Sequence, residues 1–232
     1  MRLQGKNAVI TGGANGIGHA IALAYAKEGA RVTVLDRDAK GQKTAEAIQK
    51  LGGEAAFVQV DVADRETLTA AIQNAGPVDI LVTSAAILEK CSILDSTMED
   101  FDRTMETNIH GVMNAVQAVI PGMKAQNSGK IIILSSMASF LGRADQTAYA
   151  AAAGTLTGFT RNAAVRLGEF GIHVNSIAPG IIDTDFPRVP EGRAGIPGVP
   201  HPLHPAAAHR QAGGRDRCCH LPGQRRVRLR YR

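Results

Sequence analysis

Residues 7–18 read Asn-Ala-Val-Ile-Thr-Gly-Gly-Ala-Asn-Gly-Ile-Gly, and this stretch decides the fold. The apolar, β-branched run at 7–11 is typical of a strand buried on both faces of a parallel sheet. From Ile17 onward apolar side chains recur at helical spacing, so the glycines lie between a strand end and a helix start. Glycines there allow a tight turn and let backbone amides approach a pyrophosphate closely. The stretch therefore predicts a dinucleotide-binding loop.

The next apolar run, residues 31–35, ends in Asp36, which follows Gly18 by eighteen residues. A carboxylate about 20 residues beyond the glycines binds the adenosine ribose diol in such folds. Its negative charge would repel a 2′-phosphate, which favours NAD over NADP. Arg37 keeps NADP open as the alternative, because a guanidinium beside the ribose can hold that phosphate. The other interpretation of Asp36 is a solvated strand end.

Strands and helices continue to alternate along the chain. Further strands are predicted at residues 56–60, 80–82, 130–134 and 172–177, and long helices at 109–124 and 147–168. The alternation predicts an α/β fold, a Rossmann-type doubly wound parallel sheet whose ligand site lies along the carboxyl ends of the strands. A length of 232 residues with 44% apolar content fits one such domain.

The spacing Thr-Gly-x-x-x-Gly-x-Gly at residues 11–18 resembles the short-chain dehydrogenase/reductase family, of the single-domain type, and the similarity is collinear over residues 3–186. The resemblance implies an NAD(P)-dependent oxidoreductase that transfers a hydride between nicotinamide and a secondary alcohol or ketone. It implies three catalytic residues: Asn108 at a helix kink, Ser136 as the donor to the substrate carbonyl, and Tyr149 as general acid/base. The cofactor contacts that it implies are Gly12, Asn15, Gly16, Ile17, Gly18, Asp36, Asp61, Val62, Ala85, Tyr149, Pro179, Gly180 and Thr184.

Each catalytic candidate also has a structural interpretation. Tyr149 could mark the boundary of an amphipathic helix, Ser136 could end a strand, and Asn108 could cap or interrupt a helix. The histidines show no metal-ligand spacing, so no metal site is predicted.

Two positions depart from the family pattern. The family carries a lysine one helical turn after the tyrosine, where this chain has Ala153. A free tyrosine has a pKa of about 10, so about one in a thousand is ionised at neutral pH, and a nearby ammonium corrects this. We expect activity reduced by about 10² to 10⁴. Residues 83–86 read Thr-Ser-Ala-Ala where the family has Asn-Asn-Ala-Gly, and the Ala86 methyl group is expected to weaken cofactor binding. The alternatives are a non-catalytic dinucleotide-binding protein and a damaged gene product.

The chain divides into a catalytic domain, residues 1–186, and an aberrant tail, residues 187–232. The tail contains ten Arg, no Lys, two acidic residues and seven Pro, so its net charge is +8, ten less two. Such a composition predicts irregular structure, and a sheet that lacks its last strand. We interpret the tail as a frame-shifted terminus; the alternative is a nucleic-acid or membrane-binding arm, suggested by the basic run at 225–232.

The remaining features point to a cytoplasmic protein. Three cysteines, two of them adjacent, do not indicate an oxidising compartment. The amino-terminal residues lead directly into a strand without a signal peptide, and apolar runs stay below 18 residues. We expect a small-molecule alcohol or ketone as substrate and neither nucleic acid nor membrane as a partner. The resemblance also implies a possible homo-oligomer, since the dimer interfaces of the family use the two long helices, and the oligomeric state stays open.

Overall fold

The computed structural model describes residues 1–184, in which six strands alternate with helices. The strands are β1 (Asn7–Thr11), β2 (Arg31–Asp36), β3 (Ala55–Gln59), β4 (Ile80–Thr83), β5 (Gly129–Leu134) and β6 (Ile172–Ile177). The α-helices are α1 (Gly16–Lys27), α2 (Gly41–Lys50), α3 (Arg65–Asn74), α4 (Met98–Met105), α5 (Gly111–Gln126) and α6 (Thr147–Gly168). A π-helical segment, η1 (Glu106–His110), joins α4 to α5, and a 3-10 turn, η2 (Met137–Ser139), follows β5. The predicted tail at 187–232 lies outside the described residues.

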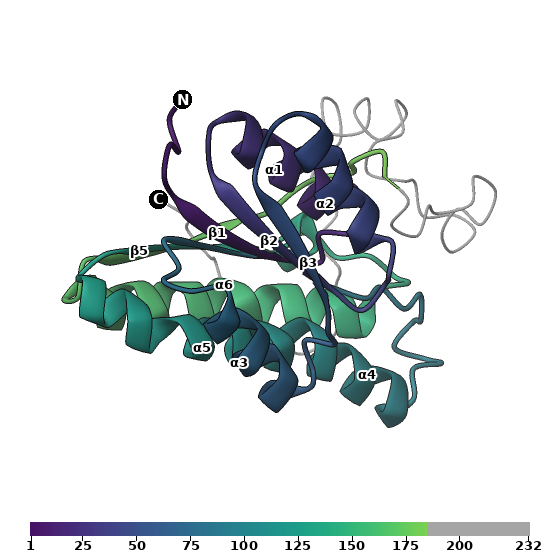
Figure 1. The fold of residues 1–232 in the computed structure, drawn as a ribbon. Helices are drawn as coiled ribbons and strands as arrows, with labels where there is room; N and C mark the ends of the chain where they lie inside the picture. Colours follow the sequence, from purple (N-terminus) through teal and green to yellow (C-terminus); the bar gives the residue numbers. More distant parts are fainter. Residues whose placement is uncertain (185–232) are drawn as a thin grey trace, which may run out of the picture. The chain divides into compact units, whose positions relative to one another are not determined.

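The strands form one parallel sheet in the order β3-β2-β1-β4-β5-β6 (Figure 1). The chain starts in the middle of the sheet, builds outward to β3, and then returns to β4 on the other side of β1. The direction of winding therefore reverses between β1 and β4, which opens a crevice at their carboxyl ends. The predicted Rossmann-type doubly wound sheet is confirmed; the predicted loss of a last strand concerns residues that are not described.

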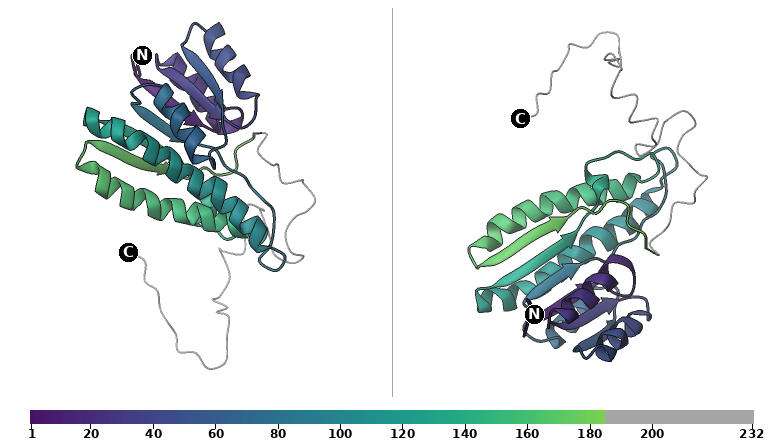
Figure 2. Two further views of the ribbon diagram at one scale, coloured as in Figure 1. Left: turned by 60° about the horizontal axis from the view of Figure 1, so that its bottom comes forward. Right: turned by 90° about the horizontal axis from the view of Figure 1, so that it is seen from above.

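Helices cover both faces of the sheet, as Figures 1 and 2 show. On β1, Val9 packs into the larger core with α3, α5 and α6, whereas Ala8 and Ile10 pack into the smaller core with α1 and α2. All three side chains are fully buried. This alternation is the period of two that a strand imposes, and burial on both faces explains why residues 7–11 read as a nearly continuous apolar run.

The two strands after α5 are covered less evenly. Ile131 and Ile133 of β5 are fully buried in the larger core, and Ile172 and Val174 of β6 join them. The intervening His173 is exposed. Among residues 1–184, β6 is thus an edge strand with one well-buried face.

Several helix ends follow from local sequence signals. Asp64 caps α3 by accepting hydrogen bonds from the amides of Glu66 and Thr67, and Thr97 forms a capping box with Asp100 at the start of α4. The helix predicted at 147–168 has those bounds, whereas the one predicted at 109–124 is entered through the π-helical segment. Within the part of the chain that the structure describes, none of the helices has the length and apolar character needed to cross a membrane.

Candidate active site

A pocket of about 720 Å³ lies along the carboxyl ends of the strands. It is lined by the ends of β2 and β5, by the segments that follow β1, β3, β4 and β6, and by α6, so the fold gathers residues that are far apart in the sequence. The predicted site residues in its wall are Gly12, Asn15, Gly16, Ile17, Asp36, Asp61, Val62, Ala85, Asn108, Ser136, Tyr149, Pro179, Gly180 and Thr184. The predicted residue Gly18 is not among the lining residues.

The glycine turn after β1 is packed too tightly for side chains. Gly12 has a φ of +69°, and a Cβ there would collide with the backbone of Ala85. Gly18 lies beneath the turn, where a Cβ would meet the carbonyl oxygen of Gly12, which explains its absence from the pocket wall. The close fit leaves the first-turn amides of α1, at Gly16 and Ile17, at the pocket without intrahelical partners. Such a helix start is an anion site.

Asp36, at the end of β2, orients its carboxylate toward this turn. Its Oδ2 accepts a hydrogen bond from the amide of Ala14 at 2.9 Å, and its Oδ1 accepts one from the amide of Asp38, also at 2.9 Å. A carboxylate offers about four acceptor positions, so two remain for a diol. Arg37 also lines the pocket and is exposed.

The segment after β3 also lines the pocket, through Val60, Asp61 and Val62. Val62 is buried against Gly111, where a Cβ would collide with the valine side chain. The Nδ2 of Asn114 donates to the carbonyl oxygen of Val62 at 3.1 Å, and the Oδ1 of Asp61 accepts from the amide of Ala63. The sequence indicated Asp61 and Val62. It gave no signal for Asn114, because an asparagine within a helix is common.

Asn108 lies buried in the π-helical segment that joins α4 to α5. Its Nδ2 donates to the carbonyl oxygen of Ile87 at 2.9 Å, and its Oδ1 accepts from the amide of Ile87 at 2.8 Å. Both halves of the side-chain amide thus bind one residue of the loop after β4. Because this loop lines the pocket, Asn108 fixes one of its walls.

Ser136 and Tyr149 both line the pocket and are joined by a side-chain hydrogen bond. Ser136 is the second residue after β5 and the N-cap of η2, and Tyr149 lies in the first turn of α6. Burial raises the pKa of Tyr149 above its ordinary value of 10.0, and the hydrogen bond from Ser136 opposes this shift. Ser136 Oγ also accepts from the amide of Ala138 at 3.1 Å, which fixes the hydroxyl beside the phenol.

Ala153 lies one turn after Tyr149 and faces the pocket with a 4% exposed side chain. Its carbonyl oxygen accepts from Ser135 Oγ at 3.0 Å, which ties α6 to the end of β5. The basic residues in the described lining are Arg37 and Arg103. No described side chain lowers the pKa of Tyr149 by its positive charge.

The loop after β4 is held differently from the family pattern. Within the described residues, the hydroxyl of Thr83 is buried without a hydrogen-bond partner. Thr11 Oγ1 instead accepts from the amides of Ser84 and Ala85, at 3.3 and 3.4 Å. The side-chain hydrogen bonds that join β1 to this loop are therefore made by a residue of β1, Thr11.

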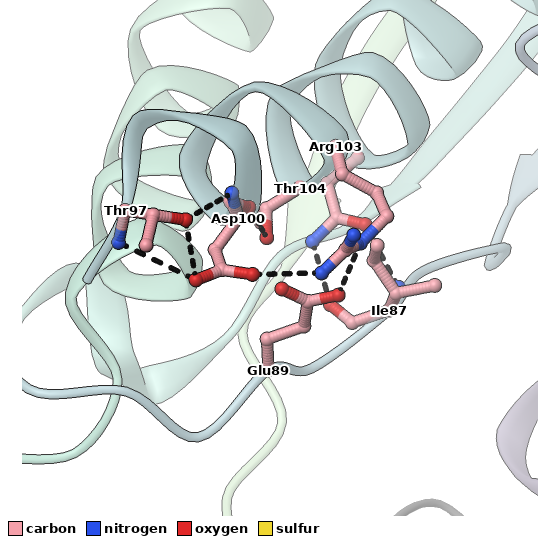
Figure 3. Close-up of polar contacts among 7 residues, drawn as sticks. Ile87, Glu89, Thr97, Asp100, Arg103 and Thr104 are labelled. Carbon is pink, nitrogen blue, oxygen red and sulfur yellow. Dashed lines mark hydrogen bonds and ion pairs between the residues drawn. The ribbon is translucent and has the colours of Figure 1, made fainter. Parts of the chain in front are cut away.

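Figure 3 shows a charged cluster that the sequence did not indicate, in which Glu89 and Arg103 line the pocket and Asp100 binds Arg103. Arg103 of α4 donates from Nε to Glu89 and from Nη2 to Asp100, the latter at 2.8 Å. The hydrogen bond and charge of Glu89 raise the pKa of Arg103. The guanidinium is committed to two carboxylates, so the cluster as a whole does not attract anions.

The segment after β6 forms another part of the pocket wall. The carbonyl oxygen of Pro179 accepts from the amide of Met137 at 3.0 Å, and Thr184 lies close to Gly16. Groups of His, Cys, Asp and Glu that could hold a metal ion are absent from the described part of the chain.

Fold and site together define a class: a Rossmann-type single-sheet protein with a glycine turn and a serine–tyrosine pair in one pocket. The family model described as short chain dehydrogenase matches residues 6–190, and the chain belongs to the short-chain dehydrogenase/reductase family of oxidoreductases. An uncharacterized oxidoreductase of Thermotoga maritima is 37% identical over 188 residues, which cover 80% of this chain and 75% of that protein. A sorbitol dehydrogenase of Cereibacter sphaeroides is also 37% identical, over 79% of this chain and 73% of that protein.

Solved structures give the same result. A structure from Beutenbergia cavernae, assigned as an NAD(P)-dependent gluconate 5-dehydrogenase with NADP bound at low occupancy, matches with a TM-score of 0.77 and 32% identity. The match covers 79% of this chain and 75% of that one. A short-chain type dehydrogenase/reductase from Mycobacterium marinum matches with a TM-score of 0.76 and 34% identity, over 79% and 76% of the two chains.

Proposed function

We propose that this protein is an NAD-dependent oxidoreductase that interconverts a secondary alcohol and a ketone, with turnover slowed by Ala153. The observation that carries the proposal is the hydrogen-bonded pair of Ser136 and Tyr149 in the pocket that the glycine turn also lines. A phenol beside a hydroxyl donor suits proton exchange at a substrate oxygen.

The residues present fit an adenine dinucleotide. The turn at Gly12 admits no Cβ, and the first-turn amides of α1 would hold the pyrophosphate. Asp36 would accept from the ribose diol and disfavour a 2′-phosphate, which supports NAD over NADP. Asp61 and Val62 would contact the adenine, and the segment from Pro179 to Thr184 the nicotinamide amide. When bound, the nicotinamide supplies the hydride acceptor or donor.

The chain's own groups handle the substrate oxygen. Ser136 donates a hydrogen bond to it, and Tyr149 takes up or returns its proton. Asn108 keeps the loop after β4 in place through Ile87 and thereby maintains the pocket wall.

Burial raises the pKa of Tyr149 above its ordinary value, and Ala153 supplies no positive charge to lower it. Fewer than about one phenol in a thousand is then ionised at neutral pH, so proton removal from an alcohol is slow. The same observation favours a second candidate, a dinucleotide-binding protein without turnover.

Fluorescence titration with NADH and NADPH, followed by turnover assays, tests the proposal. Sugar alcohols and sugar acids belong in the substrate panel, because two relatives are assigned as sorbitol and gluconate 5-dehydrogenases. We expect tighter NADH binding and slow turnover that Tyr149→Phe abolishes. Binding without turnover supports the second candidate. Failure to bind either cofactor refutes both and favours a damaged gene product.

Two further interpretations stay predictions. The location in the cytoplasm is proposed from the sequence, and a homo-oligomer that uses α5 and α6 is proposed from the resemblance to the family. Analytical ultracentrifugation of the purified chain measures the oligomeric state.

A further inference from the structure

One peptide unit of the glycine turn, that between Gly13 and Ala14, is hydrogen-bonded on both sides. Its carbonyl oxygen, on Gly13, accepts from Thr44 Oγ1 at 3.0 Å. Its amide, on Ala14, donates to Asp36 Oδ2 at 2.9 Å. Thr44 belongs to α2 and lies 31 residues from Gly13, so this contact is long-range.

The direction of the hydrogen bonds around Thr44 follows from donor chemistry. A carbonyl oxygen only accepts, so the Thr44 hydroxyl must donate its proton to Gly13. The contact at 2.8 Å between Thr44 Oγ1 and His19 Nδ1 then requires His19 to donate. His19, in the first turn of α1, therefore carries a proton on Nδ1 and orients the threonine hydroxyl. Thr44 is 1% exposed, so water does not substitute for either partner.

We propose that Thr44 is a positioning residue for the cofactor, acting through the orientation of the Gly13–Ala14 peptide; the proposal rests on the function proposed above. A reversed peptide would present the Gly13 carbonyl oxygen to the Asp36 carboxylate in place of the Ala14 amide, and like partial charges repel. The peptide lies between Gly12 and Asn15, which both line the pocket, so its orientation affects the shape of the loop there. Thr44 and Asp36 hold the peptide in one orientation before the cofactor arrives. A loop that is already ordered loses less entropy on binding.

This arrangement gives Asp36 two tasks. Its carboxylate both holds the amide of Ala14 and faces the ribose position. The carbonyl end of the peptide depends on Thr44, so substitution of Thr44 perturbs the pyrophosphate loop while the Asp36 side chain itself is kept.

The test is the dissociation constant for NADH, by fluorescence titration, in Thr44→Val and Thr44→Ser. Valine keeps the shape and removes the hydroxyl, whereas serine keeps the hydroxyl. We expect Thr44→Val to weaken NADH binding about tenfold, the upper part of the range for one net hydrogen bond. Thr44→Ser is expected within about twofold of the wild type, because it restores the same donor.

Thr160→Val is the matched control. Thr160 is also a buried threonine, 7% exposed, and its Oγ1 donates to a backbone carbonyl, that of Leu156, at 2.7 Å within its own helix. Both valine variants are expected to lower the melting temperature of the cofactor-free protein, but only Thr44→Val weakens NADH binding. Equal NADH affinity in folded Thr44→Val and wild type overturns the positioning role alone. Absence of NADH binding by the wild type overturns the proposed function as well.

Discussion

Replacing Ala153 with lysine tests whether the missing cation limits turnover. Position 153 faces the pocket one helical turn from Tyr149, so an ammonium there reaches the neighbourhood of the phenol. Two charges about 5 Å apart interact by about 3 kcal/mol at the effective dielectric constant of a protein site. That energy corresponds to a pKa decrease of about two units, in the direction opposite to the increase that burial causes.

The expected result is a turnover gain of about 10²-fold at neutral pH, because the ionised fraction of Tyr149 rises by that factor. The assay follows NADH formation by absorbance with a secondary alcohol from the panel. Ala151→Lys is the control, since Ala151 is exposed on the same helix and adds the same charge away from the pocket. If Ala153→Lys folds, binds NADH and turns over no faster than Ala151→Lys, the reasoning about the tyrosine pKa is wrong.

Three further outcomes are expected. Because burial raises the pKa of Tyr149 above its ordinary value of 10.0, the rate of alcohol oxidation by the wild type should keep rising with pH up to and beyond pH 10. A pH–rate profile measures this, and a plateau near neutrality contradicts it. Gly12→Ala should lower the free energy of unfolding by about 1–3 kcal/mol and abolish NADH binding, because its φ is positive and its Cβ would strike Ala85; denaturant titration and fluorescence measure the two effects, and unchanged NADH affinity would count against the packing argument. Asn108→Leu should destabilise the protein by about 2–3 kcal/mol, because it leaves the backbone of Ile87 unsatisfied, and a loss below about 0.5 kcal/mol in urea unfolding would show that the loop finds other partners.

The sequence pattern predicted the strands and helices themselves, because these depend on local sequence. The run at 7–11 is buried on both faces, and helix 147–168 begins and ends where its pattern predicts. The boundaries of β3 are one residue earlier than predicted, which is within the usual uncertainty of a strand end.

The contacts between elements could not be predicted in the same way. Thr44, Asn114 and Arg103 lie in ordinary helical sequence, and only the folded chain brings them to the turn, to Val62 and to Glu89. The substitution of the family's asparagine by Thr83 correctly directed attention to the loop after β4. Its physical consequence, a buried hydroxyl without a partner among the described residues, needed the structure.

The π-helical segment Glu106–His110 also sets the rotational phase of everything that follows it in α5. A π-helical turn contains about one residue more than an α-helical turn. Each residue of an α-helix is rotated by about 100° about the helix axis relative to the one before it. Deleting one residue of the segment would restore regular winding and turn Gly111 away from Val62, with a larger side chain rotated into its place. The length of the π-helical segment therefore fixes which residues of α5 face Val62. We expect that insertions or deletions here disrupt this packing, whereas a surface loop would accommodate them.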